Sequence, residues 1–171
     1  MTIQDLHSDE FNPYYDTYIS KVGTQSLKEG LKESGQKTYD FLNSISEEKY
    51  NYAYADGKWT IKELVQHIID VERVFMYRAL RIARQDKTPS PSFDENDYAS
   101  NSDANRRTKE DLIGEYKAVR NSTIILFNSF TDKMLLSKGI ASDSPLSVRA
   151  SGFITIGHEI HHCNIIKERY L

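Results

Sequence analysis

The chain has 171 residues, a length typical of one domain, and we expect a single helical domain over residues 1–171. Charged residues make up 27% of it and the net charge is −3, so the basic surface that general nucleic-acid binding requires is missing. No apolar run has the length of a membrane span, and the polar residues after Met1 do not form a secretory signal. Because Cys163 is the only cysteine, an intrachain disulfide is impossible, and a cytoplasmic location is expected.

Helix signals begin near the start of the chain. Pro13 can open a short helix that includes Tyr18. Ser26 and Glu29 stand three residues apart, in the order of a capping box, in which each side chain bonds the other residue's backbone N–H. This start signal predicts a helix over residues 25–45.

The second long helix has the clearest pattern. Thr60 and Glu63 form another capping box sequence. Apolar residues then recur at spacings of four, three and four, which places them on one helix face: Leu64, Ile68, Val71 and Phe75. We therefore expect a helix over residues 60–84.

Two further helices are predicted over residues 108–130 and 147–169. The segments 85–107 and 132–147, which contain prolines and many small polar residues, are interpreted as loops, and no alternating strand pattern is found. Four long helices with long connections predict an all-α four-helix bundle. The core of such a bundle is a common place for a metal site.

The loop 85–107 is long enough to contribute to function. It follows the helix that carries His67, and it could fold back along that helix to border a site there. Phe93, Asp97 and Tyr98 are the residues of this loop that we expect to reach the site. A surface loop without such a role is the alternative.

Histidines provide the strongest functional signal. His158 and His162 are four residues apart in a predicted helix, so both project from one face and could share a divalent metal ion. His67, on another predicted helix, could be a third ligand. Three histidines leave one coordination position open, as in catalytic sites. His161 could replace His162 as the partner of His158, because spacing alone does not distinguish the two.

Several polar residues near these histidines have two interpretations. Asp70 could orient His67 or act as a base, or it could be an exposed helical carboxylate. Arg78 lies on the face of His67 and could bind a substrate carboxylate or phosphate, or it could be solvated. Glu63 and Glu159 could accept hydrogen bonds from metal-bound histidines. For Glu63, the capping box is the favoured interpretation.

The stretch from Gly57 to Ile68, with Trp59-Thr60 at its helix start and His67 near its end, resembles the DinB/YfiT-like superfamily. The His158-x-x-x-His162 pair on the last helix completes the resemblance. It implies a four-helix bundle, often dimeric, with a divalent metal ion, zinc or nickel, held by His67, His158 and His162. By the same resemblance His161 is a neighbour of the site rather than a ligand.

Members of this superfamily include transferases that use low-molecular-weight thiols and proteins named as metal-dependent hydrolases. The resemblance therefore implies a metal-dependent enzyme that activates a bound thiol or water and acts on a small-molecule substrate. A low-molecular-weight thiol is a possible second cofactor. The alternative from another class is a non-catalytic metal-binding or small-ligand-binding protein of a stress response, and a homodimer is expected in either case.

Overall fold

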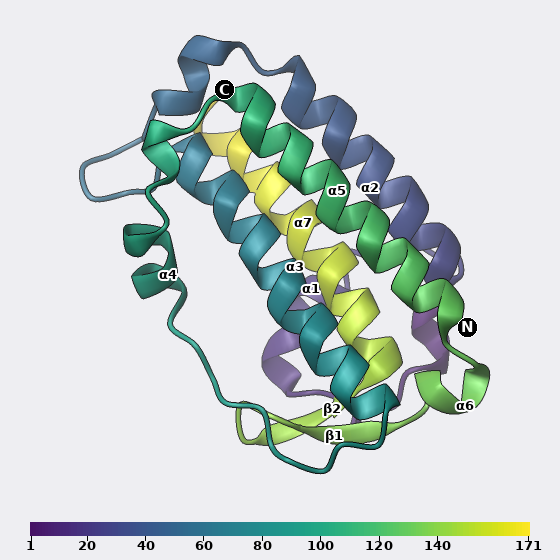
Figure 1. Ribbon diagram of the computed structural model, residues 1–171. Coiled ribbons are helices and arrows are strands. Elements are labelled where there is room, and N and C mark those ends of the chain that lie inside the picture. The colour runs from purple at the N-terminus through teal and green to yellow at the C-terminus, as the bar shows by residue number, and fades with distance from the viewer.

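Four long helices form the frame of the protein (Figure 1). The computed structural model describes all 171 residues and places these helices at α2 (Leu27–Ser44), α3 (Ile61–Ala83), α5 (Lys109–Ser129) and α7 (Val148–Arg169). These bounds confirm the four predicted helices, and the predicted all-α four-helix bundle is confirmed with them. No helix combines the length and the apolar character that crossing a membrane would require.

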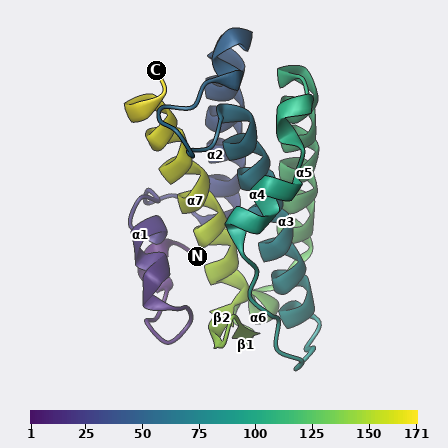
Figure 2. The ribbon, with the colours of Figure 1, turned by 90° about the vertical axis from the view of Figure 1, so that its left-hand side faces the viewer.

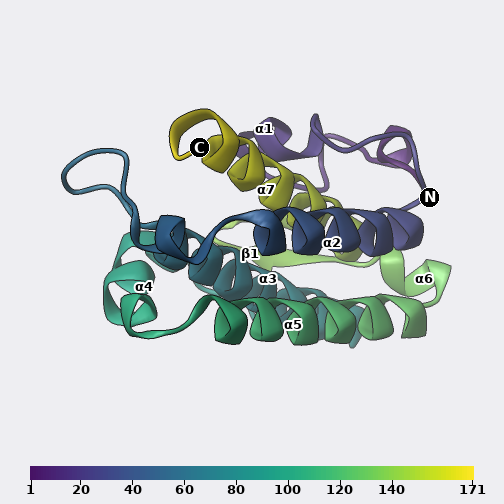
Figure 3. The same ribbon diagram turned by 90° about the horizontal axis from the view of Figure 1, so that it is seen from above.

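The order of directions in the bundle is up, down, down, up. α2 and α7 run one way while α3 and α5 run the other (Figures 1 and 3). α3 packs against α7 and α5, and α2 packs against α5 and α7, so the four helices stand around a square. Since α3 and α5 run parallel, the chain between them must return along the whole bundle. This return explains the length of the 85–107 connection.

Side chains fix where the helices begin. At α3, the Thr60 N–H donates to the Glu63 carboxylate at 2.8 Å, and the Glu63 N–H donates to the Thr60 hydroxyl at 3.2 Å. At α2, the carboxylate of Glu29 accepts hydrogen bonds from the N–H and hydroxyl of Ser26. The predicted short helix near Tyr18 is also present, as α1 (Asp16–Ile19).

Both connections that were predicted as plain loops contain regular structure. Within 85–107, α4 (Glu95–Asn101) begins where the Asp94 carboxylate accepts the first N–H groups of the helix (Figure 2). Within 132–147, α6 (Asp132–Leu135) precedes an antiparallel hairpin of β1 (Lys138–Ala141) and β2 (Ser144–Ser147). The expectation that this second segment lacks strands was wrong.

The hairpin was not predicted from the sequence, because its turn lacks the usual residues and its strands are short. Ser142 and Asp143 form the turn with φ of 50° and 58°, the left-handed conformation that two-residue hairpin turns require. Neither residue is the glycine that usually marks such a turn. Four-residue strands are also too short to display an alternating pattern.

A buried ionic network separates two apolar clusters in the core. Arg120 of α5 donates to both carboxylate oxygens of Glu72 on α3, at 2.8 and 2.9 Å, and to both of Glu159 on α7, at 2.7 and 2.9 Å. It also reaches α2, through the Leu31 carbonyl and the Ser34 hydroxyl. One guanidinium therefore contacts all four helices.

α1 packs directly on α7, and a glycine permits this close approach. A side chain at Gly157 would collide with the backbone carbonyl group of Tyr18. Since backbone cannot move aside as a flexible side chain can, α1 would have to shift away from α7. This contact matters for function because Tyr18 and His158 lie in the same region.

We predict that Gly157→Ala lowers the free energy of unfolding by about 1–3 kcal/mol, the usual cost of forcing extra atoms into a packed contact. Gly114→Ala is the matched control, because Gly114 lies on an exposed face of α5 with open space around it. Alanine there should stabilise the helix by about 0.5–1 kcal/mol. Urea unfolding of both variants measures the difference, and equal effects would contradict the proposed contact.

Candidate metal centre

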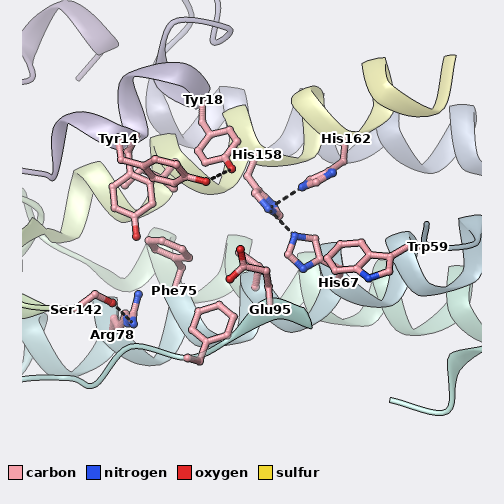
Figure 4. A pocket seen from close by; sticks show the side chains of 14 residues that line it. Tyr14, Tyr18, Trp59, His67, Phe75, Arg78, Glu95, Ser142, His158 and His162 are labelled. Carbon is pink, nitrogen blue, oxygen red and sulfur yellow. Dashed lines mark hydrogen bonds between the residues drawn. The ribbon is translucent and has the colours of Figure 1, made fainter. Parts of the chain in front are cut away.

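Two antiparallel helices bring the three predicted ligands together. His67 lies on α3, and His158 and His162 lie one turn apart on the facing side of α7. The Nε2 atom of His158 is 3.1 Å from Nε2 of His67 and 3.0 Å from Nε2 of His162 (Figure 4). The three histidines thus form a candidate metal site, with ligand atoms that all lie within 4.8 Å of one another.

The geometry of the donor atoms fits a bound metal ion. Nitrogens that each lie about 2 Å from one ion are separated from each other by about 3 Å. Between neutral histidines, hydrogen bonds explain this convergence poorly, because His158 Nε2 faces two other ring nitrogens and can donate only one hydrogen. A shared ion would use the lone pairs of all three rings.

Burial keeps these histidines in the form that binds metal. It lowers the pKa of His67 to about 4, and it lowers the pKa values of His158 and His162 well below the ordinary value, with the neighbouring histidines adding to the effect. Each ring is therefore neutral at neutral pH and has a lone pair available. The histidine rings are therefore already positioned to bind a metal cation, whereas their protonation is unfavourable.

The structure groups His162, rather than His161, with the other two histidines. His161 is partly exposed and lies outside the cluster, with its ring edge-on to Tyr18 at 5.3 Å between centroids. Tyr18 also contacts the His158 ring, at 5.2 Å, and Trp59 contacts the His67 ring, at 4.9 Å. Aromatic rings therefore hold two of the three imidazoles in place.

One fully buried nitrogen of the cluster lacks a hydrogen-bond partner. Nδ1 of His162 is buried without a hydrogen bond. Metal-bound histidines usually donate this second N–H to a carboxylate, a carbonyl or water. The two carboxylates predicted for that role lie elsewhere: Glu63 caps α3, and Glu159 bonds Arg120 and the Tyr116 hydroxyl.

A pocket of about 460 Å³ opens in front of the histidines (Figure 4). Its wall combines the N-terminal segment, α3, α7, the return connection and the turn of the hairpin. The lining residues are Tyr14, Tyr15, Tyr18, Trp59, His67, Val71, Phe75, Arg78, Phe93, Glu95, Ser142, Ile154, His158 and His162. An open position of the candidate site would face this pocket.

The two predicted catalytic candidates have different positions. Arg78 lines the pocket and is buried. Asp70 does not line it, and its carboxylate accepts a hydrogen bond from Gln66 at 2.9 Å. Cys163 is buried outside the pocket, and burial raises the pKa of its thiol to about 12, so it is not a nucleophile at neutral pH.

The return connection reaches the pocket, as expected, through one predicted residue and one that was not predicted. Phe93 lines the pocket, whereas Asp97 and Tyr98 do not. Glu95, the first residue of α4, was missed, and its carboxylate points into the pocket (Figure 4). Asp94 as a helix cap could have revealed this. In a helix that starts after Asp94, the side chains of Glu95 and Asp97 point to nearly opposite sides, so both cannot face the pocket.

Comparison with known proteins identifies the family. The sequence model of the DinB superfamily matches residues 31–166. The chain belongs to the DinB superfamily. This match includes all three histidines of the candidate site and all four long helices except the ends of α2 and α7.

One relative and one solved structure are similar to this DinB protein over nearly its whole length. A protein of Oceanobacillus iheyensis named "Putative metal-dependent hydrolase" is 27% identical over 98% of this chain and 86% of its own. The structure of YfiT from Bacillus subtilis, described as a probable metal-dependent hydrolase with an unusual four-helix bundle topology, matches with a TM-score of 0.73 at 16% identity. That match covers 96% of this chain and 90% of YfiT.

A third similar structure is a mycothiol-dependent maleylpyruvate isomerase. It matches with a TM-score of 0.67 at 10% identity, over 95% of this chain and 62% of the isomerase. At this identity the likeness concerns the fold, which supports one bundle over nearly the whole chain.

We predict that the metal-free DinB protein loses stability as the pH falls from 6.5 to 4. Unfolded His67 takes up a proton near pH 6.5, whereas folded His67 does so only near pH 4, so acid favours the unfolded chain in this window. At 1.36 kcal/mol per pKa unit the loss from His67 is about 3 kcal/mol. Urea unfolding in EDTA at several pH values measures it.

The control for this pH dependence is His67→Gln, which cannot titrate. Its stability should fall less steeply over the same pH window. Equal slopes in the two proteins would show that His67 is not held in its neutral form by burial.

Proposed function

We propose that this protein is a divalent-metal-dependent enzyme in which His67, His158 and His162 hold the ion. The observation that carries the proposal is the position of the three Nε2 atoms at the wall of an open 460 Å³ pocket. A structural metal site is closed by a fourth protein ligand, whereas here the remaining position faces space for a substrate. Zinc or nickel suits a set of three imidazoles.

Such an ion, when bound, lowers the pKa of a water or thiol at its open position and so supplies a nucleophile at neutral pH. The chain's own residues bind and orient the substrate. Aromatic side chains from the N-terminal segment, α3 and the return connection provide apolar contact, and Arg78 provides a positive charge. The partly buried rings of Tyr15, Tyr18 and Trp59 also shield the histidines from bulk water.

Glu95 is the proposed proton acceptor. It is the only carboxylate that lines the pocket, and Figure 4 shows it pointing toward the histidines. A carboxylate in this position could remove a proton from the nucleophile and return it to the leaving group. Asp70 lacks this access, because it lies outside the pocket.

Two reaction types fit this arrangement. Hydrolysis of an ester or amide by water is supported by the name of the Oceanobacillus iheyensis relative and by the description of YfiT. Transfer of a low-molecular-weight thiol is the second candidate, supported by the structural likeness to a mycothiol-dependent enzyme. The thiol would have to come from outside, since the only cysteine is buried away from the pocket.

We predict that the purified protein binds one zinc or nickel ion and that His67→Ala, His158→Ala and His162→Ala each lose it. His161→Ala is the matched control and should keep one equivalent, because His161 lies outside the cluster. Elemental analysis after dialysis against each metal gives the stoichiometry. Full occupancy in any of the three ligand variants would refute the site as proposed.

We predict that Glu95→Gln reduces turnover about 100-fold or more, the usual contribution of a positioned acid or base, while metal content stays unchanged. Asp70→Asn is the control and should retain turnover. The assay screens ester and amide substrates in water, and then electrophilic substrates with cysteine, glutathione or bacillithiol as thiol. Full metal occupancy without turnover in any arm would favour a non-catalytic binding protein.

A further inference from the structure

The three buried arginines of this protein differ in one respect. Arg78, Arg120 and Arg149 are 2%, 4% and 5% exposed. Two glutamates pair with Arg120, and one pairs with Arg149. Arg78 forms no ion pair, although it is the least exposed of the three.

All protein partners of the Arg78 guanidinium are neutral. Its Nη2 atom donates to the carbonyl of Pro91 at 2.7 Å and to the hydroxyl of Ser142 at 2.9 Å. The hydroxyl of Tyr15 also lies beside it. A guanidinium carries five N–H donors, so these partners leave donors for a further acceptor.

The unused donors belong to a side chain in the wall of the pocket. Arg78 lines it together with Ser142, at the end away from the histidines (Figure 4). Phe75 and Phe93 contact the guanidinium, with their ring centroids 5.4 and 5.8 Å from its carbon. These rings and the two hydrogen bonds hold the charged group in a fixed orientation.

A buried charge without a counterion is unfavourable. Taking an ion out of water costs several kcal/mol, and a nearby opposite charge normally offsets that cost. Burial lowers the pKa of Arg78, whereas the bond to Glu10 raises that of Arg149. The pocket thus contains a buried positive charge that forms no ion pair with a carboxylate of the chain.

We propose that Arg78 binds a carboxylate group of the substrate, at the end of the pocket opposite the three histidines. Planar carboxylates match the two-pronged geometry of a guanidinium. One positive side chain balances the single charge of a carboxylate, whereas a phosphate dianion would bring a second, unbalanced negative charge into a pocket that also contains the Glu95 carboxyl group. Describing this ligand as the substrate rests on the proposed function; the binding of a carboxylate does not.

The distance between Arg78 and the histidines sets a minimum length for a substrate that reaches both. Arg78 follows His67 by eleven residues, about 16 Å along the helix axis at 1.5 Å per residue. Both side chains lean toward the start of α3, and that of Arg78 is the longer, so the gap between the guanidinium and the His67 ring is shorter than this. We therefore infer a substrate in which several bonds separate the carboxylate from the reacting group.

The test uses the metal-free protein in EDTA, so that no carboxylate can bind a metal ion. 4-Phenylbutyrate and its uncharged analogue 4-phenylbutanamide are titrated and followed by heteronuclear NMR. The carboxylate should bind at least tenfold more tightly and shift the amide signals of Ser142 and Phe93. Arg78→Met and Arg78→Gln should abolish this preference.

Equal binding of the two probes to the natural protein would overturn the proposal, and so would a preference that survives in both variants. Tighter binding of 3-phenylpropyl phosphate than of 4-phenylbutyrate would also overturn it, because the site would then prefer a phosphate group to a carboxylate. The titration is done without metal, so its result does not depend on whether the histidines bind zinc or nickel. In the same way, a titration that shows no carboxylate preference does not contradict the proposed metal site.

Stability provides a second, ligand-free readout. Arg78→Met removes an unpaired charge and should unfold at the same urea concentration as the natural protein, or at a higher one. Arg149→Met is the comparison, since it leaves a buried glutamate without its partner and should unfold much earlier. An equally early transition in Arg78→Met would show that the chain already compensates this charge, which contradicts the proposal.

Discussion

The contact of one guanidinium with all four helices sets the geometry on which the rest of the structure depends. Arg120 lies between the two apolar clusters, and its carboxylate partners require defined positions along α3 and α7. Apolar side chains tolerate sliding of one helix along another, but a buried ion pair does not, because any displacement leaves charge without a partner. Glu159 directly follows His158 on α7, so the network that fixes α7 also fixes the histidines. The two neighbours are about 100° apart around the helix axis, so Glu159 faces the core and His158 faces the pocket.

The parallel arrangement of α3 and α5 has a second effect, on the pocket. It forces a long return connection, which passes the open end of the histidine cluster and brings Phe93 and Glu95 there. Short connections between antiparallel neighbours would leave this side of the bundle uncovered. The hairpin at the far end adds Ser142, and the N-terminal segment adds three tyrosines. The pocket is therefore a product of how the chain connects its helices.

Local signals were sufficient to predict the frame and the histidines. Capping residues and 3.6-residue periodicity act within one helix, and so does the spacing of His158 and His162. The ionic network involves three helices at once, and nothing in the local sequence relates Arg120 to Glu72. A hint existed, since Arg120 shares the face of Tyr116, Thr123 and Phe127, where a solvated side chain is unexpected. The hairpin, α4 and the role of Glu95 depend on how connections lie against helices, which periodicity does not describe.

The candidate metal ligands and part of the pocket wall come from different kinds of structure in this protein. The three histidines stand on α3 and α7, inside the rigid frame, whereas Phe93, Glu95 and Ser142 stand on the connections. Connections accept insertions and substitutions far more readily than packed helices do. Mutations can therefore reshape what enters the pocket while the three histidines stay in place. This separation would let the scaffold acquire new substrates by changes in two connections, and the same two segments are the natural targets for redesigning its selectivity.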